Sequence, residues 1–211
     1  AAHELRTPLA VMRAQIDAMP PSPQVDALRG DVEAMSRLVA QLLRLAEADQ
    51  LAVPTGATCD LAEVAREVTA ALGPLALARR RALALDAPAS PVLVRGLPGP
   101  LGQAIRNLVE NALRHAPEGG MVAVEVGAGG RLAVADDGPG IPEGDRAHIF
   151  KRFWRRDRSA GDGAGLGLAI VAKIVEAHGG SVAVDAPPAG GTRFVLTLEP
   201  VAAPAGKEDA A

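Results

Sequence analysis

Apolar residues at the start of the chain recur in two heptad-like series. Alternating steps of four and three separate the members of the first series, Leu5, Leu9, Met12, Ile16 and Met19. After the sequence PPSP the same spacing links Val25, Leu28, Val32, Met35, Val39, Leu42 and Ala46. This spacing is typical of helices with one apolar face, so we predict an antiparallel helical hairpin over residues 1–53. A single hairpin leaves its apolar seam open, and pairing two hairpins into a four-helix bundle would bury that seam, which predicts a homodimer.

The pattern changes after the sequence VPTGATC (53–59), whose proline and glycine mark a linker. A second domain is expected over residues 59–200, where short apolar runs alternate with amphipathic segments. The runs predict strands at 82–86, 92–95, 121–126, 131–135, 181–185 and 192–198. The amphipathic segments predict helices at 60–80, 100–115, 143–149 and 166–178. Since no regular βαβ units emerge, we predict an α+β chain whose second domain is an α/β sandwich with a mixed sheet. The small, polar tail 201–211 is expected to be disordered.

Composition narrows the class of protein. Hydrophobic residues make up 48% of the 211 positions, which is enough for a core, and the formal net charge of −3 favours neither nucleic acid nor an anionic membrane. One cysteine, Cys59, excludes an internal disulfide and suits a reducing compartment. No apolar run reaches the roughly 18–20 residues of a membrane-spanning helix. We therefore expect a cytoplasmic location.

Two asparagines stand out in the sequence NLVENALRHAP (107–117). Asn107 and Asn111 lie four residues apart, on one face of the predicted helix. Asparagine is a poor helix-interior residue, and a buried amide without a partner costs about 1–3 kcal/mol. Their carbonyl oxygens would suit Mg²⁺, which retains some waters and reaches phosphates through the rest of its shell. Arg114 and His115, one turn further on, could face phosphate oxygens.

Two glycine-rich stretches complete the candidate chemistry. In ADDGPGIP (135–142) Asp136 precedes Gly138 and Gly140, and its carboxylate could accept a hydrogen bond from a base amine. The stretch GDGAGLGLAIV (161–171) leads into an apolar helix and contains Gly163, Gly165, Leu166, Gly167 and Leu168. Either stretch alone indicates only a tight turn and a flexible loop. Together with the asparagines they predict a nucleotide pocket, because glycines allow close backbone approach and helix N-termini favour phosphate. Neither a Walker phosphate loop nor a dinucleotide fingerprint is present.

The order of these motifs resembles the ATP-binding domain shared by sensor histidine kinases, type II topoisomerases and heat-shock chaperones. NLVENALRHA is similar to its N box, DDGPGIP to its G1 box, IFKRFWR (149–155) to its F box and GAGLGLAIV to its G2 box. GGTRF (190–194), with Thr192, is similar to its terminal motif, and the resemblance spans residues 60–198. In topoisomerases and chaperones the position of Asn107 holds a glutamate that acts as general base. Glu110 is turned from that position by about 60° on a helix, so slow hydrolysis is expected.

The sequence AAHELRTPL resembles the H box of histidine kinases. The resemblance implies that His3 is phosphorylated, that Glu4 orients its ring and takes a proton, and that Thr7 positions water for dephosphorylation. It further implies Mg·ATP as phosphoryl donor, a response regulator as partner, and membrane attachment only through segments absent from this chain, which is expected to be N-terminally truncated. Two alternatives remain: an ATPase that drives conformational change, and a catalytically inactive dimeric interaction module.

Four further residues have open roles. Arg152, Arg155 and Arg156 could meet the γ-phosphate, but a solvated surface would explain them equally well. His178 is expected to end a helix instead of taking part in catalysis.

Overall fold

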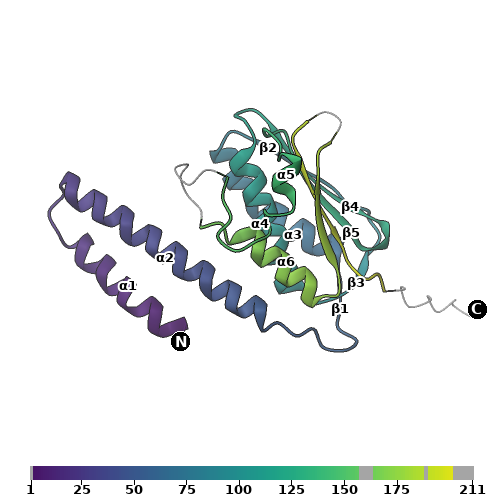
Figure 1. The fold of residues 1–211 in the computed structure, drawn as a ribbon, viewed down its shortest axis with the longest axis horizontal. Helices are drawn as coiled ribbons and strands as arrows, with labels where there is room; N and C mark the ends of the chain where they lie inside the picture. Colours follow the sequence, from purple (N-terminus) through teal and green to yellow (C-terminus); the bar gives the residue numbers. More distant parts are fainter. Residues whose placement is uncertain (1, 157–163, 188–189, 202–211) are drawn as a thin grey trace, which may run out of the picture.

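The computed structural model describes residues 2–156, 164–187 and 190–201, with side chains from Thr7 onward. The chain opens with an antiparallel hairpin of α1 (Ala2–Asp17) and α2 (Pro23–Asp49), seen at the left of Figure 1. Ser22 caps α2, because its Oγ accepts a hydrogen bond of 3.2 Å from the backbone N–H of Val25. Ile16 of α1 forms a buried cluster with Val25 and Val32 of α2, so the predicted hairpin is confirmed.

The hairpin buries one set of heptad positions and exposes the other. Leu9, Ile16, Val25 and Val32 are buried. The alternate positions, Met12, Met19, Leu28, Met35 and Leu42, are exposed on the open side. We call these five residues the exposed seam. This is the open apolar surface that the heptad spacing predicted for a single hairpin.

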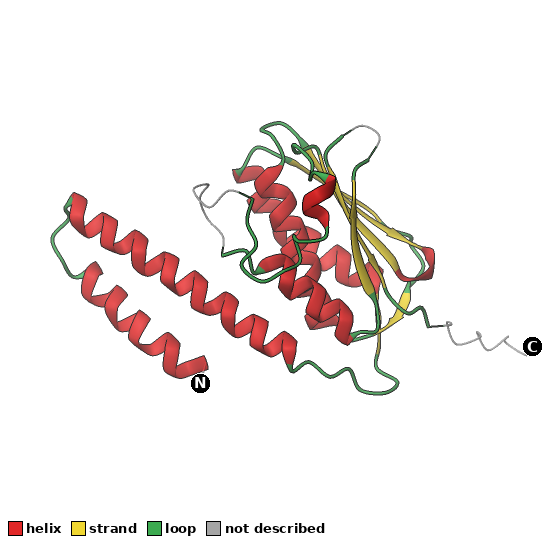
Figure 2. Ribbon diagram, in the orientation of Figure 1, coloured by secondary structure: helices red, strands yellow, loops and turns green. Residues whose placement is uncertain are grey.

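The remaining elements form a five-stranded mixed sheet covered by helices, and their first and third strands form a small two-stranded sheet. In chain order they are β1 (Thr58–Asp60), α3 (Leu61–Ala78), β2 (Ala82–Asp86), β3 (Leu93–Arg95), α4 (Pro98–His115), β4 (Met121–Gly127), a 3₁₀ turn (Ala128–Gly130), β5 (Arg131–Asp136), α5 (Glu143–Arg146), α6 (Gly167–Ala177), β6 (Ser181–Asp185) and β7 (Thr192–Thr197). The strand order is β2-β4-β5-β7-β6, with β2 and β4 parallel and the other pairs antiparallel. Helices α3, α4 and α6 lie on one face of the sheet (Figure 2). The predicted α/β sandwich is confirmed.

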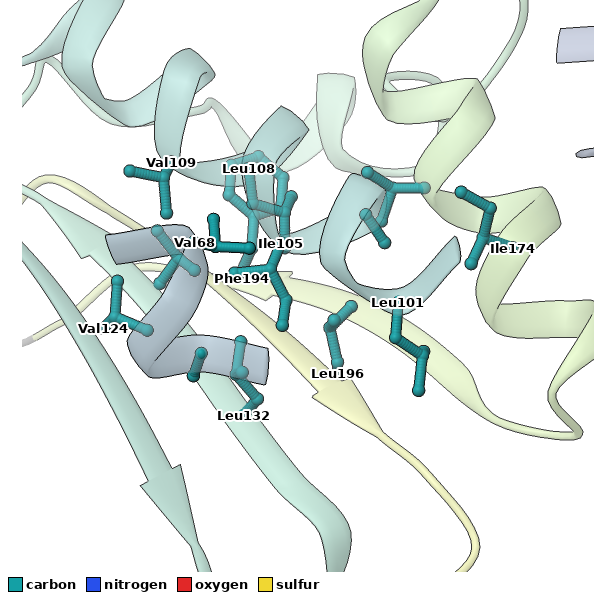
Figure 3. Close-up of a cluster of buried hydrophobic side chains, with 14 of the residues drawn as sticks. Val68, Leu101, Ile105, Leu108, Val109, Val124, Leu132, Ile174, Phe194 and Leu196 are labelled. Atoms are coloured by element: carbon teal, nitrogen blue, oxygen red, sulfur yellow. The ribbon is translucent and has the colours of Figure 1, made fainter. Parts of the chain in front are cut away.

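The core fills the space between these helices and the sheet. Leu101, Ile105 and Leu108 of α4 are fully buried, facing Phe194 and Leu196 of β7 (Figure 3). Their spacing of three and four residues places them on one helical face, and the strand residues alternate in the same direction. Burying large side chains of this kind contributes roughly 1.5–3 kcal/mol each. This packing fixes α4 against the sheet, and with it the two asparagines of α4.

Some local expectations differ from the structure. Asp60 caps α3 as predicted, since its Oδ1 accepts from Ala62 N at 3.0 Å, but it also accepts from Val92 N at 2.9 Å. The small β1–β3 sheet was not predicted. The helix expected at 143–149 is limited to the four residues of α5. Val201 donates its N–H to the carbonyl of Leu93 at 2.9 Å. The rest of the predicted disordered tail lies outside the described residues.

The C-terminal half of α2 packs on the second domain. Leu45 and Ala48 are buried in the same apolar cluster as the residues of α6, and α2 lies against α6. At the end of α2 the carboxylate of Asp49 accepts two hydrogen bonds, of 2.7 and 2.9 Å, from Nη2 of Arg152. Heptad spacing alone did not predict this contact. Among the described helices, none is both long enough and apolar enough to span a membrane.

Candidate nucleotide site

A cavity of about 330 Å³ opens between α4, α6 and the ends of β5 and β7. Most of the residues proposed from the sequence meet in it: Asn107, Asn111, Arg114, His115, Asp136, Gly140, Gly165, Gly167, Leu168 and Thr192. Two others lie beside it. Leu166 is fully buried in the core, and Gly138 supports Asp136 as described below. Gly163 lies outside the described residues.

Asp136 forms the end of β5 and is 4% exposed. Its Oδ1 accepts a hydrogen bond of 2.8 Å from Gly138 N. Burial raises the pKa of this carboxyl to about 6; the Gly138 bond opposes that rise and the charge of Asp137 adds to it. A side chain at position 138 would bring its Cβ within 2.5 Å of the Asp136 carboxylate, so only glycine leaves this carboxylate in place.

The neighbouring Asp137 forms a hydrogen bond outside the cavity. Its exposed carboxylate accepts a hydrogen bond of 2.8 Å from the backbone N–H of Met121, and it does not line the cavity. Thr192 stands directly opposite Asp136 in the β5–β7 register and is likewise buried. Side chains of directly opposed residues lie about 5 Å apart. Asp136 and Thr192 therefore form one polar end of the cavity.

Asn107 and Asn111 lie along the wall formed by α4. The amide nitrogen of Asn107 is buried and has no hydrogen-bond partner among the described residues. A buried polar group of this kind needs an explanation, and a ligand of the cavity would provide one. In the described ranges no three His, Cys, Asp or Glu side chains gather into a metal cage. The orphan Nδ2 is a donor that suits an anionic ligand, and the amide oxygens of the two asparagines are of the kind that ligate a hydrated Mg²⁺.

Basic residues border the same cavity. Arg114, Arg155 and Arg156 line it, and Arg156 also pairs with Asp145 at 3.2 Å. Burial lowers the pKa of His115, and the charges of Arg114 and Arg156 lower it further. Arg152 is not part of this group, since it binds Asp49 of α2. The three cavity arginines can balance an anionic ligand.

The segment after α5 folds against the start of α6. Phe153 donates its N–H to the carbonyl of Gly165 at 3.0 Å. Gly165 has φ +69°, and a Cβ there would lie 2.5 Å from the carbonyl oxygen of Trp154. Of the three aromatic residues, Phe150 packs edge-on against Phe194, Trp154 lines the cavity and Phe153 is 59% exposed. Phe150 and Trp154 both pack against the apolar core, so Trp154 joins the core to the cavity.

Two polar residues that line the cavity were not predicted from the sequence to contact a ligand. Glu110 lines it, so the 60° rotation that separates it from Asn107 does not turn it away; its carboxylate also lies 3.8 Å from Arg106. Gln41 of α2 lines it as well. The only signal for Gln41 was that it interrupts a second apolar stripe on α2, formed by Leu38, Leu45 and Ala48.

The proposed acceptor residues lie on α1. His3 and Glu4 are in its first turn, and the structure does not describe their side chains. Thr7 is exposed one turn later. His178 has a structural environment, as expected: it is fully buried and forms the C-cap of α6. Its Nδ1 lies 2.6 Å from the carbonyl of Ile174, and its Nε2 accepts from Leu97 N at 3.1 Å.

The fold and the cavity define a nucleotide-binding α/β sandwich joined to a helical hairpin. Residues 96–202 match the family described as histidine kinase-, DNA gyrase B-, and HSP90-like ATPase. Residues 1–51 match the His Kinase A (phospho-acceptor) domain. The chain belongs to the sensor histidine kinases.

Individual relatives agree with this assignment. Sensor protein SphS of Synechococcus elongatus is 36% identical over 98% of this chain and 55% of its own length. The histidine-protein kinase/phosphatase MprB of Mycolicibacterium vanbaalenii is 35% identical over 100% of this chain and 47% of its own length. The chain thus spans about half the length of the curated relatives it matches.

Solved structures extend the similarity to three dimensions. Full-length ShkA in complex with AMPPNP superposes with a TM-score of 0.76 at 31% identity, over 97% of this chain and 45% of that one. The histidine kinase AdeS of Acinetobacter baumannii superposes with a TM-score of 0.64 at 27% identity, over 93% and 97% of the two chains. Both matches cover the hairpin as well as the sandwich.

Proposed function

We propose that this chain is the catalytic core of a sensor histidine kinase. It binds Mg·ATP, transfers the γ-phosphoryl group to His3 and passes it to an aspartate of a response regulator. The observation that carries the proposal is the cavity itself, which joins a buried carboxylate, two amides and the start of α6 in a chain whose first 51 residues match a phospho-acceptor domain. Residues 1–53 and 59–200 are the proposed functional units.

The two ends of the cavity suit the two ends of ATP. The Asp136 carboxylate would accept a hydrogen bond from the exocyclic amine of adenine. The start of α6 and the three cavity arginines would meet the phosphates. Asn107 and Asn111 would hold Mg²⁺, which would neutralise charge on the phosphates when bound.

Phosphoryl transfer then requires a nucleophile in place of water. The unprotonated ring nitrogen of His3 forms a bond to the γ-phosphorus as the bond to the ADP oxygen breaks, and Glu4 takes the proton that the ring releases. A neutral imidazole is available near pH 7 because its ordinary pKa is about 6.5. Asn107 stands where the related ATPases carry their general base, which leaves the phosphoryl group for histidine.

Retention of label on the protein tests this function. Wild-type protein incubated with γ-³²P-ATP should retain acid-labile label, and His3→Gln should retain none while its ATP affinity stays unchanged. The affinity can be followed through Trp154, the single tryptophan, because it lines the cavity. Label that persists on His3→Gln in an acid-stable form would contradict the assignment. Absence of nucleotide binding by the wild type would favour the interaction module.

A second candidate function is slow ATP hydrolysis, favoured by the position of Glu110 in the cavity. If Glu110 activates water, Glu110→Gln should lower release of free phosphate several-fold and leave label on His3 unchanged. Equal phosphate release in both proteins would remove this candidate.

Partners and location belong to the same proposal. The exposed seam is proposed to pair with a second copy of the chain. Since the relative MprB is named a kinase/phosphatase, Thr7 is proposed to support removal of phosphate from the response regulator. The core is proposed to work in the cytoplasm.

A further inference from the structure

We propose that Gln41 of the hairpin is a ligand-contacting residue of the ATP site and that its side-chain amide binds the terminal phosphate. The inference rests on the proposed ATP binding and extends it to a second domain. Gln41 lines the cavity together with residues of α4 and α6. In the part of the chain that the structure describes, no hydrogen bond to its side chain is found, so the amide is available for a ligand. An amide N–H can donate to a phosphate oxygen without adding charge.

The position of Gln41 in the cavity corresponds to the phosphate end. The base end is formed by Asp136 and Thr192, which come from β5 and β7. Gln41 instead comes from α2, and α2 packs on α6. Helix α6 begins at Gly167, which also lines the cavity. Because helix N-termini favour phosphate, the phosphates are expected at the start of α6, the helix on which α2 packs, and we assign Gln41 to that end of the cavity.

The register of the hairpin brings the acceptor to the same level. Ile16 forms one buried cluster with Val25 and Val32, and His3 lies thirteen residues before Ile16. Antiparallel helices rise equally per residue, so the backbone of residue 3 is level with residues 38–45 of α2. Gln41 lies near the middle of that range. The backbone of His3 and the cavity-lining residue Gln41 therefore lie at the same level along the hairpin.

A salt bridge holds this part of α2 in place. Asp49, two turns after Gln41, binds Arg152 through both carboxylate oxygens. Arg152 is followed by Trp154 and Arg155, which line the cavity. Burial of Leu45 and Ala48 fixes the helix between these two points. Gln41 is thus positioned from both sides, as a contact residue requires.

Nucleotide affinity of the full chain tests the proposal. Gln41→Leu keeps the volume of the side chain and removes the amide. It should weaken ATP binding about tenfold and ADP binding less than about twofold, as read from Trp154 fluorescence. Gln24→Leu, an exposed position near the start of α2, is the matched control and should change neither affinity. Melting temperatures without nucleotide should agree among the three proteins.

The outcomes separate this inference from the function on which it rests. If ATP and ADP affinities of Gln41→Leu equal those of the wild type, or fall by the same factor, the phosphate contact is wrong while ATP binding stands. If the wild type binds no nucleotide, the proposed function fails first. Asp49→Arg should shift the ATP affinity in the same direction as Gln41→Leu, and adding Arg152→Asp should restore it. Failure of that rescue would overturn the positioning role of the salt bridge.

Discussion

At the scale of single residues, Asp136 shows how one carboxylate serves both the turn and the cavity. Its Oδ1 binds Gly138 N, as turn aspartates often do, and the same carboxyl lines the cavity. Burial disfavours its charge, so its pKa rises to about 6. At neutral pH the carboxyl is therefore ionised but largely shielded from water. A hydrogen bond from an amine donor would stabilise its charge.

Asp136 should set the preference for ATP over GTP. An ionised carboxylate pairs with the amine of adenine but faces the guanine oxygen as a second acceptor, which should cost at least about tenfold in affinity. Asp136→Asn should weaken ATP binding and shrink the ATP/GTP ratio, because an amide can donate. ATP affinity of the wild type should fall as the pH drops through about 6, where Asp136 takes a proton. The same pH series measured on Asp136→Asn shows how much of the change comes from titration of the nucleotide itself. An unchanged ATP/GTP ratio in Asp136→Asn would show that Asp136 does not recognise the base and would make Asp137 the next candidate.

Asn111 should be required for phosphoryl transfer. Asn111→Ala removes an amide oxygen from the cavity wall and should lower the labelling of His3 by roughly 100-fold or more, since metal charge is needed when phosphate charge develops. The fold should survive, because Asn111 lies at the edge of the buried face of α4. Melting temperature without nucleotide is the control. A fully active variant at ordinary Mg²⁺ would show that this amide holds no metal.

At the scale of elements, His178 joins the end of one helix to the start of another. It is the C-cap of α6, and its Nε2 accepts the N–H of Leu97, the N-cap of α4. The backbone N–H of an N-cap residue has no partner within its own helix, and His178 satisfies this donor. The two helices that form the cavity walls are thereby tied together away from the cavity.

Removing His178 should destabilise the domain. His178→Ala leaves a space and an unpaired N–H, and should lower the free energy of unfolding by about 2–4 kcal/mol. Burial lowers the pKa of His178 below 6.5. Its contribution is therefore fully present above pH 6.5 and is lost as the pH falls toward the lower folded-state pKa. Urea unfolding at pH 7.5 and 5.5 should show a smaller pH effect in the variant. His148→Ala, at an exposed position, is the control, and equal pH effects in wild type and His178→Ala would contradict this role.

At the scale of the whole molecule, α2 belongs to both domains. One of its faces packs on α1 through Val25 and Val32, and its last turns pack on α6 through Leu45 and Ala48. Met35 and Leu42, with Leu28, leave a third face exposed. Because α2 packs on α1 through one apolar face and on α6 through another, it can relate the position of the hairpin to the nucleotide cavity.

The exposed seam should determine the oligomeric state. Met35→Glu places a charge in the middle of the seam, and in a dimer it would bury that charge without a partner. The variant should shift from dimer to monomer in light scattering after size exclusion. Leu77→Glu alters a residue of α3 that is 79% exposed and should leave the dimer intact. A dimer that survives Met35→Glu would place the interface on another surface.

The sequence by itself determined the parts of the molecule that depend on local spacing. Heptad positions such as Ile16 and Val32 gave the hairpin, and alternation gave strands 82–86 and 181–185 with their observed bounds. The asparagine pair and the glycines predicted the nucleotide cavity, because close backbone approach needs particular residue types. The motif of Asp136, Gly138 and Gly140 singled out Asp136 as a candidate for base recognition, and Asp136 lines the cavity whereas Asp137 does not.

Tertiary structure alone decided which faces meet. Periodicity tells that a helix face is apolar but not what covers it, so neither the packing of α2 on α6 nor the salt bridge of Asp49 with Arg152 could be read from spacing. Glu110 lines the cavity because the wall of α4 is wider than one row of side chains. Gln41 reaches the same cavity from a segment 66 residues before Asn107. Contacts between such distant segments depend on how whole elements pack, which is a property of the folded chain.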